Sequence, residues 1–295
     1  MKHSSMNPTR SVAREISYAS AASTRAGRAL IRSVENLTGR LSLIRMAADY
    51  ASEIGDGRDF WQVMAERYGL TLEITAGALS NIPAEGPVVV VANHPYGILD
   101  GLMLGNILAQ ARGDFRILAN NVFRKAEALD RVILPISFDE TPEAIATNLA
   151  TRKTAIAYLA GGGCVGVFPG GTVSTAARAF GRPMDPGWRR FTARLIAKSG
   201  ATVVPMFFEG HNSRMFQLAS HLHQTLRLAL LVNEFRTRVG APVRVAIGAP
   251  LCPARLAEHA GDARVMMDFL RAETYRLSPT PIPNLSYGFE FEDTR

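Results

Sequence analysis

The stretch VVVVA, at residues 88–92, restricts the fold of this 295-residue chain more than any other feature. A continuous apolar run of this length is typical of a strand buried on both faces of a sheet. Other short runs with strand character are LTLEIT, FRILAN, VILPISF, CVGVFP, ATVVPMFF and VRVAIG. Helices are expected over 98–111, 141–161, 188–198, 215–239 and 253–277. This alternation predicts an α/β fold with a mostly parallel central sheet flanked by helices.

The first 68 residues are expected to form an N-terminal helical segment, followed by an α/β domain over residues 69–295. Residues 9–51 contain no proline. One helical face carries apolar side chains at steps of three and four, namely Leu30, Val34, Leu37, Leu41, Ile44 and Ala48. The opposite face carries Arg10, Arg14, Arg25, Arg28 and Arg32. The helix either packs on the domain with its arginines solvated, or rests on anionic lipid as a basic amphipathic element.

The charge balance points to an anionic partner, because the formal net charge is +7. An anionic membrane surface or an acidic substrate fits best. Nucleic acid is not expected, since the basic residues are not interleaved with aromatic ones and no nucleic-acid-binding motif is present. No segment reaches the roughly 18 consecutive apolar residues of a membrane span. Two cysteines and a poor signal peptide favour a reducing compartment.

Three polar segments follow predicted strands and are therefore expected at one place. His94 follows VVVVA, PGGTVS follows VGVF, and EGHNS follows VVPMFF. In parallel sheets, ligands bind outside the carboxyl ends of the strands. These segments should therefore meet at one edge of the sheet, around an apolar cleft, with His211 within reach of its rim.

His94 and Asp100, six residues apart, are the strongest candidates for chemistry. A neutral imidazole can take a proton from a hydroxyl near pH 7, and a carboxylate on its other nitrogen would fix the tautomer. The alternative is structural: the histidine caps a helix, and Asp100 is favourable in its first turn. The residues alone leave both interpretations open.

The segment Pro169–Gly170–Gly171–Thr172 is the second candidate. Exposed amides after a strand can hold an oxyanion or a phosphate, although a simple tight turn explains the same residues. The chain contains no H-E-x-x-H or C-x-x-C motif, so no metal is expected. Both cysteines, Cys164 and Cys252, are expected to fill the core.

At this point the motifs resemble those of the glycerolphosphate acyltransferase family, the lysophospholipid acyltransferases. NHPYGILDG resembles the first motif of that family, FPGGTVS resembles its F-P-E-G-T-R-S motif, and VVPMFFEG resembles its fourth block. The order and spacing agree, and the resemblance covers roughly residues 70–250.

The resemblance implies that His94 is the base and Asp100 its partner. It also implies substrate contacts from residues of the two motifs, Asn93, Pro169, Gly170, Gly171, Thr172 and Ser174. The acyl donor would be acyl-CoA or acyl carrier protein, with no cofactor. The protein would sit peripherally on the cytoplasmic face of the inner (plasma) membrane, through its N-terminal helices.

Two departures from the family pattern bear on the acceptor. Five residues rather than four separate His94 from Asp100, as in a haemolysin-like branch that includes acyltransferases of lyso-ornithine lipid. Gly170 and Val173 replace the glutamate and arginine usually assigned to the acceptor. The arginines just downstream are Arg178, Arg182, Arg189 and Arg190, which either compensate or are simply solvated.

The expected function is therefore a membrane-associated O-acyltransferase acting on a lyso-lipid, with a lyso-aminolipid such as lyso-ornithine lipid preferred. An alternative acceptor is 1-acylglycerol-3-phosphate (lysophosphatidate). A thioesterase is a further alternative, and a non-catalytic lipid-binding membrane adaptor is the alternative of another class.

Overall fold

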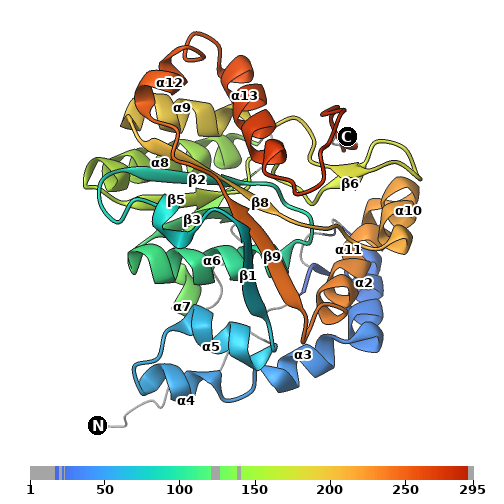
Figure 1. Ribbon diagram of the computed structural model, residues 1–295. Coiled ribbons are helices and arrows are strands. Elements are labelled where there is room, and N and C mark those ends of the chain that lie inside the picture. Colours follow the sequence, from blue (N-terminus) through green and yellow to red (C-terminus); the bar gives the residue numbers. More distant parts are fainter. Residues whose placement is uncertain (1–16, 20–21, 23, 121–126, 138–140, 292–295) are drawn as a thin grey trace.

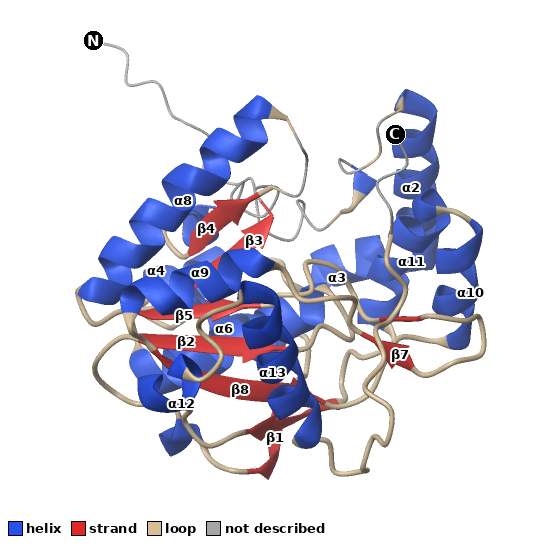
Figure 2. Ribbon diagram, turned by 90° about the horizontal axis from the view of Figure 1, so that it is seen from above, coloured by secondary structure: helices blue, strands red, loops and turns tan. Residues whose placement is uncertain are grey.

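A seven-stranded sheet forms the centre of the computed structural model, which describes residues 17–19, 22, 24–120, 127–137 and 141–291. The strand order is β1-β9-β8-β2-β5-β3-β4 (Figures 1 and 2). The strands are β1 (Thr71–Ala76), β2 (Val88–Ala92), β3 (Arg116–Asn120), β4 (Ile133–Ile136), β5 (Cys164–Val167), β8 (Thr202–Phe208) and β9 (Pro242–Ile247). β8 and β9 pair antiparallel, and the other neighbours pair in parallel. The predicted α/β class with a mostly parallel sheet is confirmed.

Helices cover both faces of the sheet. They are α2 (Arg25–Thr38), α3 (Arg40–Met46), α4 (Tyr50–Gly55), α5 (Phe60–Arg67), α6 (Ile98–Arg112), α7 (Glu127–Asp130), α8 (Pro142–Ala160), α9 (Arg190–Ser199), α10 (Arg214–Leu222), α11 (Gln224–Arg236), α12 (Pro253–Ala257) and α13 (Ala263–Arg276). Alternate valines of β2 face opposite layers. Val88 and Val90 pack in a core with α5 and α6, whereas Val89 and Val91 pack with α8, α9 and α13. This two-sided burial explains why the strand is apolar throughout.

The N-terminal helical stretch is divided into shorter helices. Gly39 ends α2 with a φ of 135°, a conformation that favours glycine. α2 packs on α11, with Ile31 in one cluster with Ala229 of α11. Of the predicted apolar face, Val34 and Ile44 pack against core clusters, whereas Leu30, Leu37 and Leu41 are exposed. The predicted face is therefore only partly the face that packs on the domain. Residues 9–16, with Arg10 and Arg14, lie outside the described residues.

Other sequence expectations need correction at element ends. The helix expected over 215–239 is two helices, because His223 has extended backbone angles between α10 and α11. The helix over 253–277 is likewise divided into α12 and α13. A two-stranded hairpin, β6 (Thr175–Ala176) with β7 (Pro183–Met184), was not predicted, because two-residue strands leave no pattern. Cys164 is buried as expected, but Cys252 is exposed.

The length and polarity of the helices also bear on membrane topology. In the part of the chain that the structure describes, no helix has both the length and the apolar character needed to cross a bilayer.

Candidate functional site

The carboxyl ends of β8, β2 and β5 bring three polar segments to one edge of the sheet. These strands are neighbours, and Val91 of β2 is in register with Val167 of β5 and Pro205 of β8. The segments that follow begin at Asn93, Phe168 and Glu209. The sequence predicted this meeting, because each of the three segments follows a strand of a mostly parallel sheet.

His94 and Asp100 lie together at this edge. Nδ1 of the imidazole is 3.0 Å from Oδ2 of the carboxylate, an ion-pair distance without the alignment of a directed hydrogen bond. The same oxygen accepts hydrogen bonds from the backbone amides of Tyr96 and Gly97, at 2.7 and 2.9 Å. Asp100 therefore caps the start of α6 and faces the imidazole, so the two interpretations of this pair are compatible.

The turn between the two residues depends on Gly97. Its φ of 96° lies in the region that favours glycine, and the backbone there reverses so that Asp100 comes back toward His94.

The Asp100 carboxylate is fully buried, whereas the His94 side chain is 18% exposed. Burial raises the pKa of Asp100, and the His94 contact and the two backbone amides only partly oppose that effect. Its second oxygen, Oδ1, has no hydrogen-bond partner within the described residues. A carboxylate in such surroundings acts strongly on its neighbour, because little water screens it. The carboxylate therefore lies where it can stabilise positive charge that develops on the imidazole.

Three contacts fix the orientation of His94. Its ring stacks on Phe168, with ring centres 4.3 Å apart and planes inclined by 23°. Its carbonyl oxygen accepts from the Ser174 amide at 2.8 Å, and its own amide donates to Asp185 Oδ1 at 3.2 Å. The first motif and the FPGGTVS motif are therefore joined through backbone as well as side chains.

Asp185 is a site residue that the sequence did not reveal. Its buried carboxylate accepts from the His94 amide, the Ser174 hydroxyl and the Trp188 indole nitrogen. Its backbone amide contacts the Tyr275 hydroxyl at 2.7 Å. No spacing marks this aspartate, since it lies 91 residues from His94 and outside both motifs.

The FPGGTVS segment forms a turn rather than an open set of amides. The Gly171 amide donates to the Phe168 carbonyl at 3.1 Å, so it does not support the expected oxyanion contact. Pro169 and Gly170 are buried in the same turn. The Thr172 amide, by contrast, has no hydrogen-bond partner in the described part of the chain. The amides of Gly170 and Val173 likewise have no hydrogen-bond partner there, so the candidate oxyanion donors include these three amides but not that of Gly171.

The polar side chains of Asn93 and Ser174 are engaged within the protein. The Asn93 amide group donates to the Phe208 carbonyl at 2.9 Å and accepts from the Phe208 amide at 2.7 Å. The Ser174 hydroxyl donates to Asp185. Asn93 thereby ties β2 to β8 and Ser174 ties the motif to Asp185, and their expected contacts with substrate stay a prediction.

Arg227, on α11, is a second residue that the sequence did not indicate. Its guanidinium is buried and donates to the Thr172 hydroxyl at 3.0 Å and to the Val173 carbonyl at 2.8 Å. Burial lowers the pKa of this side chain from its usual value. No carboxylate pairs with it among the described residues. A buried positive charge thus lies directly behind the FPGGTVS segment.

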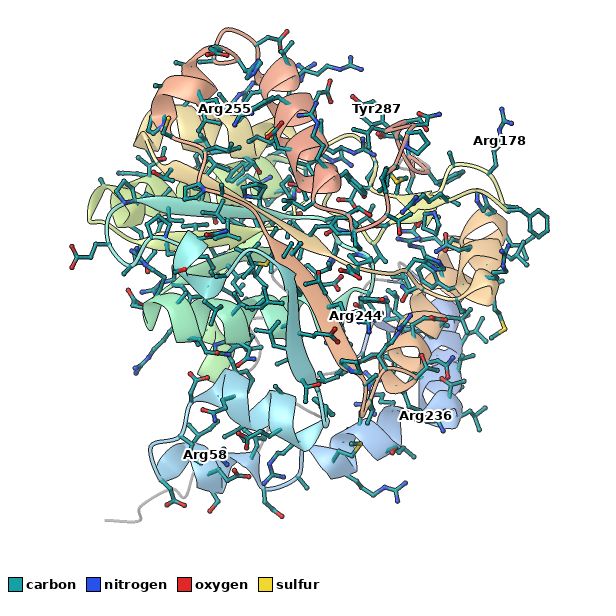
Figure 3. The ribbon with its side chains drawn as sticks, in the orientation of Figure 1. Arg58, Arg178, Arg236, Arg244, Arg255 and Tyr287 are labelled. Carbon is teal, nitrogen blue, oxygen red and sulfur yellow. The ribbon has the colours of Figure 1, made fainter. Side chains whose placement is uncertain are left out.

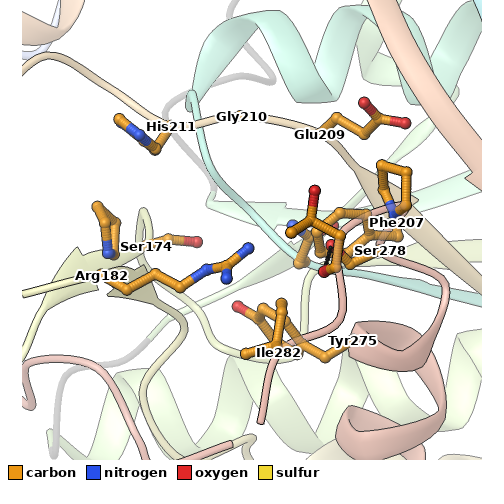
Figure 4. A pocket seen from close by; sticks show the side chains of 13 residues that line it. Ser174, Arg182, Phe207, Glu209, Gly210, His211, Tyr275, Ser278 and Ile282 are labelled. Atoms are coloured by element: carbon orange, nitrogen blue, oxygen red, sulfur yellow. Dashed lines mark hydrogen bonds between the residues drawn. The ribbon is translucent and has the colours of Figure 1, made fainter. Parts of the chain in front are cut away.

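A pocket of about 150 Å³ opens beside this edge. Its lining includes Asn93, Ser174, Arg182, Glu209, His211 and Ser278 (Figure 4). His211 reaches it, as the sequence predicted. The lining is largely polar, so this pocket is not the apolar cleft that was expected. Among the described residues, no three His, Cys, Asp or Glu side chains gather as metal ligands would.

Fold and site together define a class: an α/β protein with a histidine–aspartate pair in an N-H-P-x-G-x-x-D turn at the carboxyl edge of a parallel sheet. Comparison with known families is consistent with that class. The profile of the acyltransferase family matches residues 51–280, and the chain belongs to this family.

Two curated relatives carry the name lyso-glycine lipid O-acyltransferase. The protein from Phocaeicola vulgatus is 29% identical over 58% of this chain, and that from Bacteroides thetaiotaomicron is 26% identical over 54%. The matches span 58% and 56% of the relatives' own lengths, respectively. A crystal structure of the 1-acyl-sn-glycerophosphate acyltransferase PlsC from Thermotoga maritima is 14% identical, with a TM-score of 0.49, and covers 87% of this chain and 99% of that one.

Proposed function

We propose that this protein is a membrane-associated O-acyltransferase that transfers a fatty acyl group from an acyl thioester to the hydroxyl of a lyso-aminolipid. The observation that carries the proposal is the His94–Asp100 contact at the sheet edge of an acyltransferase-family chain. The names of the two relatives favour an amino-acid lipid, and a lyso-glycine lipid or a lyso-ornithine lipid would meet that description.

The proposed reaction begins with proton transfer to His94. The ring nitrogen that does not face Asp100 takes the proton of the acceptor hydroxyl, and the oxygen attacks the thioester carbonyl carbon. The tetrahedral intermediate then collapses: the carbon–sulfur bond breaks, and the imidazolium returns the proton to the leaving thiolate. Asp100 stabilises the imidazolium between these two steps. The products are an ester and a free thiol of CoA or acyl carrier protein.

The oxyanion of the intermediate requires donors that are already in place. The Thr172 amide is one of the donors of the FPGGTVS segment that have no partner within the described residues. The Arg227 guanidinium lies 3.0 Å from the hydroxyl of the same threonine. Its charge acts through a poorly solvated interior, where electrostatic interactions are stronger than in water. Both groups support stabilisation of negative charge near Thr172.

The nature of residue 173 argues against a phosphate-bearing acceptor such as lysophosphatidate. Val173 stands where the resembling family has an arginine, and it is buried in a small apolar cluster with Phe216 and Leu231. An apolar side chain there cannot pair with a phosphate. Arg227 approaches this position, but its donors are occupied by protein oxygens.

Association with an anionic bilayer is supported by an exposed apolar stripe on α10. Met215, Leu218 and Leu222 lie at helical spacing, and all three are exposed. Phe180, on the neighbouring β6–β7 loop, is also exposed. The net charge of +7 favours an anionic lipid surface around such a stripe. A peripheral position at the cytoplasmic membrane would place the site next to its lipid substrates.

The experiment that tests the proposal compares His94→Ala with His259→Ala. His259 is a matched control, because it also stacks on a phenylalanine, Phe269, with ring centres 4.1 Å apart. Thiol release from acyl-CoA should fall by roughly a hundred- to ten-thousandfold in His94→Ala. It should be unchanged in His259→Ala, and both variants should keep their circular dichroism spectra.

The same assay separates the alternatives. Thiol release that needs no lyso-lipid would identify a thioesterase. A folded His94→Ala protein with undiminished turnover would contradict the proposed mechanism. An adaptor would bind anionic vesicles and release no thiol with any acceptor.

A further inference from the structure

The pocket beside the reaction edge contains a positively charged side chain that nothing in the proposed chemistry uses. Arg182 begins near the second strand of the β6–β7 hairpin, and its guanidinium points into the pocket toward Ser278 (Figure 4). Tyr275 and Ile282 lie on one side of it, and the Glu209–His211 segment lies on the other. Within the described part of the chain, Arg182 has no hydrogen bond or ion pair.

This position distinguishes Arg182 from the other arginines that follow the FPGGTVS motif. Arg178, on the same loop, points away from the protein at its periphery (Figure 3). The Arg189 amide donates to the Pro169 carbonyl, and neither Arg189 nor Arg190 lines the pocket. Of the four arginines considered from the sequence, Arg182 alone lines this pocket.

The pocket lies next to the catalytic pair. Asn93, which lines it, directly precedes His94, and the amide of Ser174, another lining residue, donates to the His94 carbonyl. In an N-acyl amino acid with a 3-hydroxyacyl chain, six bonds separate the carboxyl carbon from the hydroxyl oxygen. Such a span extends to roughly 7 Å, since three backbone bonds cover at most about 3.6 Å. His94 does not itself line the pocket, so this span is the length over which the hydroxyl can extend from a headgroup in the pocket toward the imidazole.

The charges of the pocket favour a carboxylate over a phosphate. Glu209 also lines it, and its carboxylate accepts a hydrogen bond from the Thr75 hydroxyl. Glu209 repels any anion, but it repels a dianionic phosphate more strongly than a carboxylate with a single charge. A single carboxylate can instead form two parallel bonds with the planar guanidinium of Arg182.

We propose that this pocket binds the free carboxylate of the acceptor's amino-acid headgroup and that Arg182 pairs with it. The inference rests on the proposed acyltransferase function and assigns its acceptor specificity to a residue outside the two motifs. Arg182 thus takes over, from a different position, the anion recognition that Val173 cannot provide.

The test measures KM and kcat for two acceptors, an N-(3-hydroxyacyl) glycine and its methyl ester. The variants are Arg182→Gln, Arg182→Lys and, as the matched control, Arg178→Gln. For the free acid, Arg182→Gln should raise KM about tenfold or more with kcat nearly unchanged, since one charge-assisted contact is lost. Arg182→Lys should recover part of that loss, and Arg178→Gln should behave as wild type.

The methyl ester provides the decisive comparison. Its KM with the wild-type protein should already be high, and Arg182→Gln should not raise it further. An equal rise for acid and ester, or an unchanged KM for the acid, would overturn the assignment. A stronger dependence on Arg182 for lysophosphatidate than for the carboxylate acceptor would also overturn it.

Failure of the assignment remains distinguishable from failure of the proposed function. Calorimetry without any acyl donor measures the affinity for the same N-(3-hydroxyacyl) glycine, and this affinity does not depend on turnover. If the wild-type protein transfers no acyl group but binds the free acid in an Arg182-dependent way, the function fails and the pocket assignment stands. If the protein transfers the acyl group and Arg182→Gln changes neither KM nor binding, the function stands and the pocket assignment fails.

Discussion

Replacement of Asp185 by asparagine should destabilise the protein and slow acyl transfer together. The wild-type carboxylate accepts from the His94 amide and the Ser174 hydroxyl at Oδ1, and from the Trp188 indole nitrogen at Oδ2. Asparagine offers one oxygen and one NH₂ group in the same space. If the asparagine oxygen accepts from the His94 amide and the Ser174 hydroxyl, the NH₂ group faces the Trp188 indole N–H. The NH₂ group and the indole N–H are then both buried donors without an acceptor.

The magnitude follows from these three contacts. Each of the two buried donors without a partner costs about 1–3 kcal/mol, and each of the two hydrogen bonds that lose a charged acceptor loses about 1 kcal/mol. The sum is roughly 4–8 kcal/mol, which is a large share of the stability of a typical domain. The melting temperature of the variant should therefore fall by more than about 10 °C.

Thermal unfolding and thiol release from acyl-CoA test this prediction. Asp114→Asn is the matched control, because Asp114 pairs with Arg116 at the surface and is 72% exposed. Its melting temperature should change by no more than about 2 °C, as expected for an exposed ion pair. Turnover by Asp185→Asn should fall because the His94 backbone and the FPGGTVS segment lose their common anchor. An Asp185→Asn protein with wild-type melting and turnover would refute this account of the site.

Two further predictions concern Asp100 and the cysteines. Burial raises the pKa of Asp100, so the folded protein binds the carboxyl proton more tightly than the unfolded chain does. Loss of this proton therefore lowers the stability of the fold as pH rises from about 4 toward the pKa of Asp100 in the folded protein. In Asp100→Asn, the rate of thiol release should fall by about a hundredfold or more. The melting temperature of this variant should rise relative to that of the wild type as pH is raised from 4 to 7. A relative fall would show that folding lowers the pKa of Asp100 instead. A maleimide should add once to the native protein and twice after denaturation, as counted by mass spectrometry. The reason is that Cys252 is exposed, whereas Cys164 is buried and burial raises the pKa of Cys164 to about 12. Two rapid additions to the native protein would contradict the buried position of Cys164.

Much of the fold could be predicted because local patterns encode it. The four valines of β2 must be apolar on both sides, and each strand ends where polar motif residues begin. His94 and Asp100 share one short turn, so their meeting follows from nearby residues alone. The prediction was less successful for α2, where Ile31 packs with Ala229 of α11 while Leu30 and Leu37 of the predicted apolar face are exposed. Helical spacing shows that a face exists but not which neighbour will cover it.

The rest of the site could not be predicted because distant residues complete it. Asp185 and Arg227 reach the FPGGTVS segment from beside the hairpin and from α11. Arg182 was one of four downstream arginines considered from the sequence, but only the fold shows that it lines the pocket. Hairpin strands of two residues give no periodic signal, and a lone arginine in a helix resembles any surface arginine. The Gly171 amide was misjudged for a related reason, since only the coordinates show that it closes a turn on Phe168.

The network around Asp185 extends far toward the end of the chain. Its carbonyl accepts from Arg271 and from the Gly288 amide, and the Phe289 amide donates to the Thr175 carbonyl. During synthesis, the residues at 94–100 therefore emerge from the ribosome long before the segment near 288 that braces them. The reaction centre therefore lacks these bonds until the segment near residue 288 has emerged, so a shorter nascent chain should be inert toward thioesters.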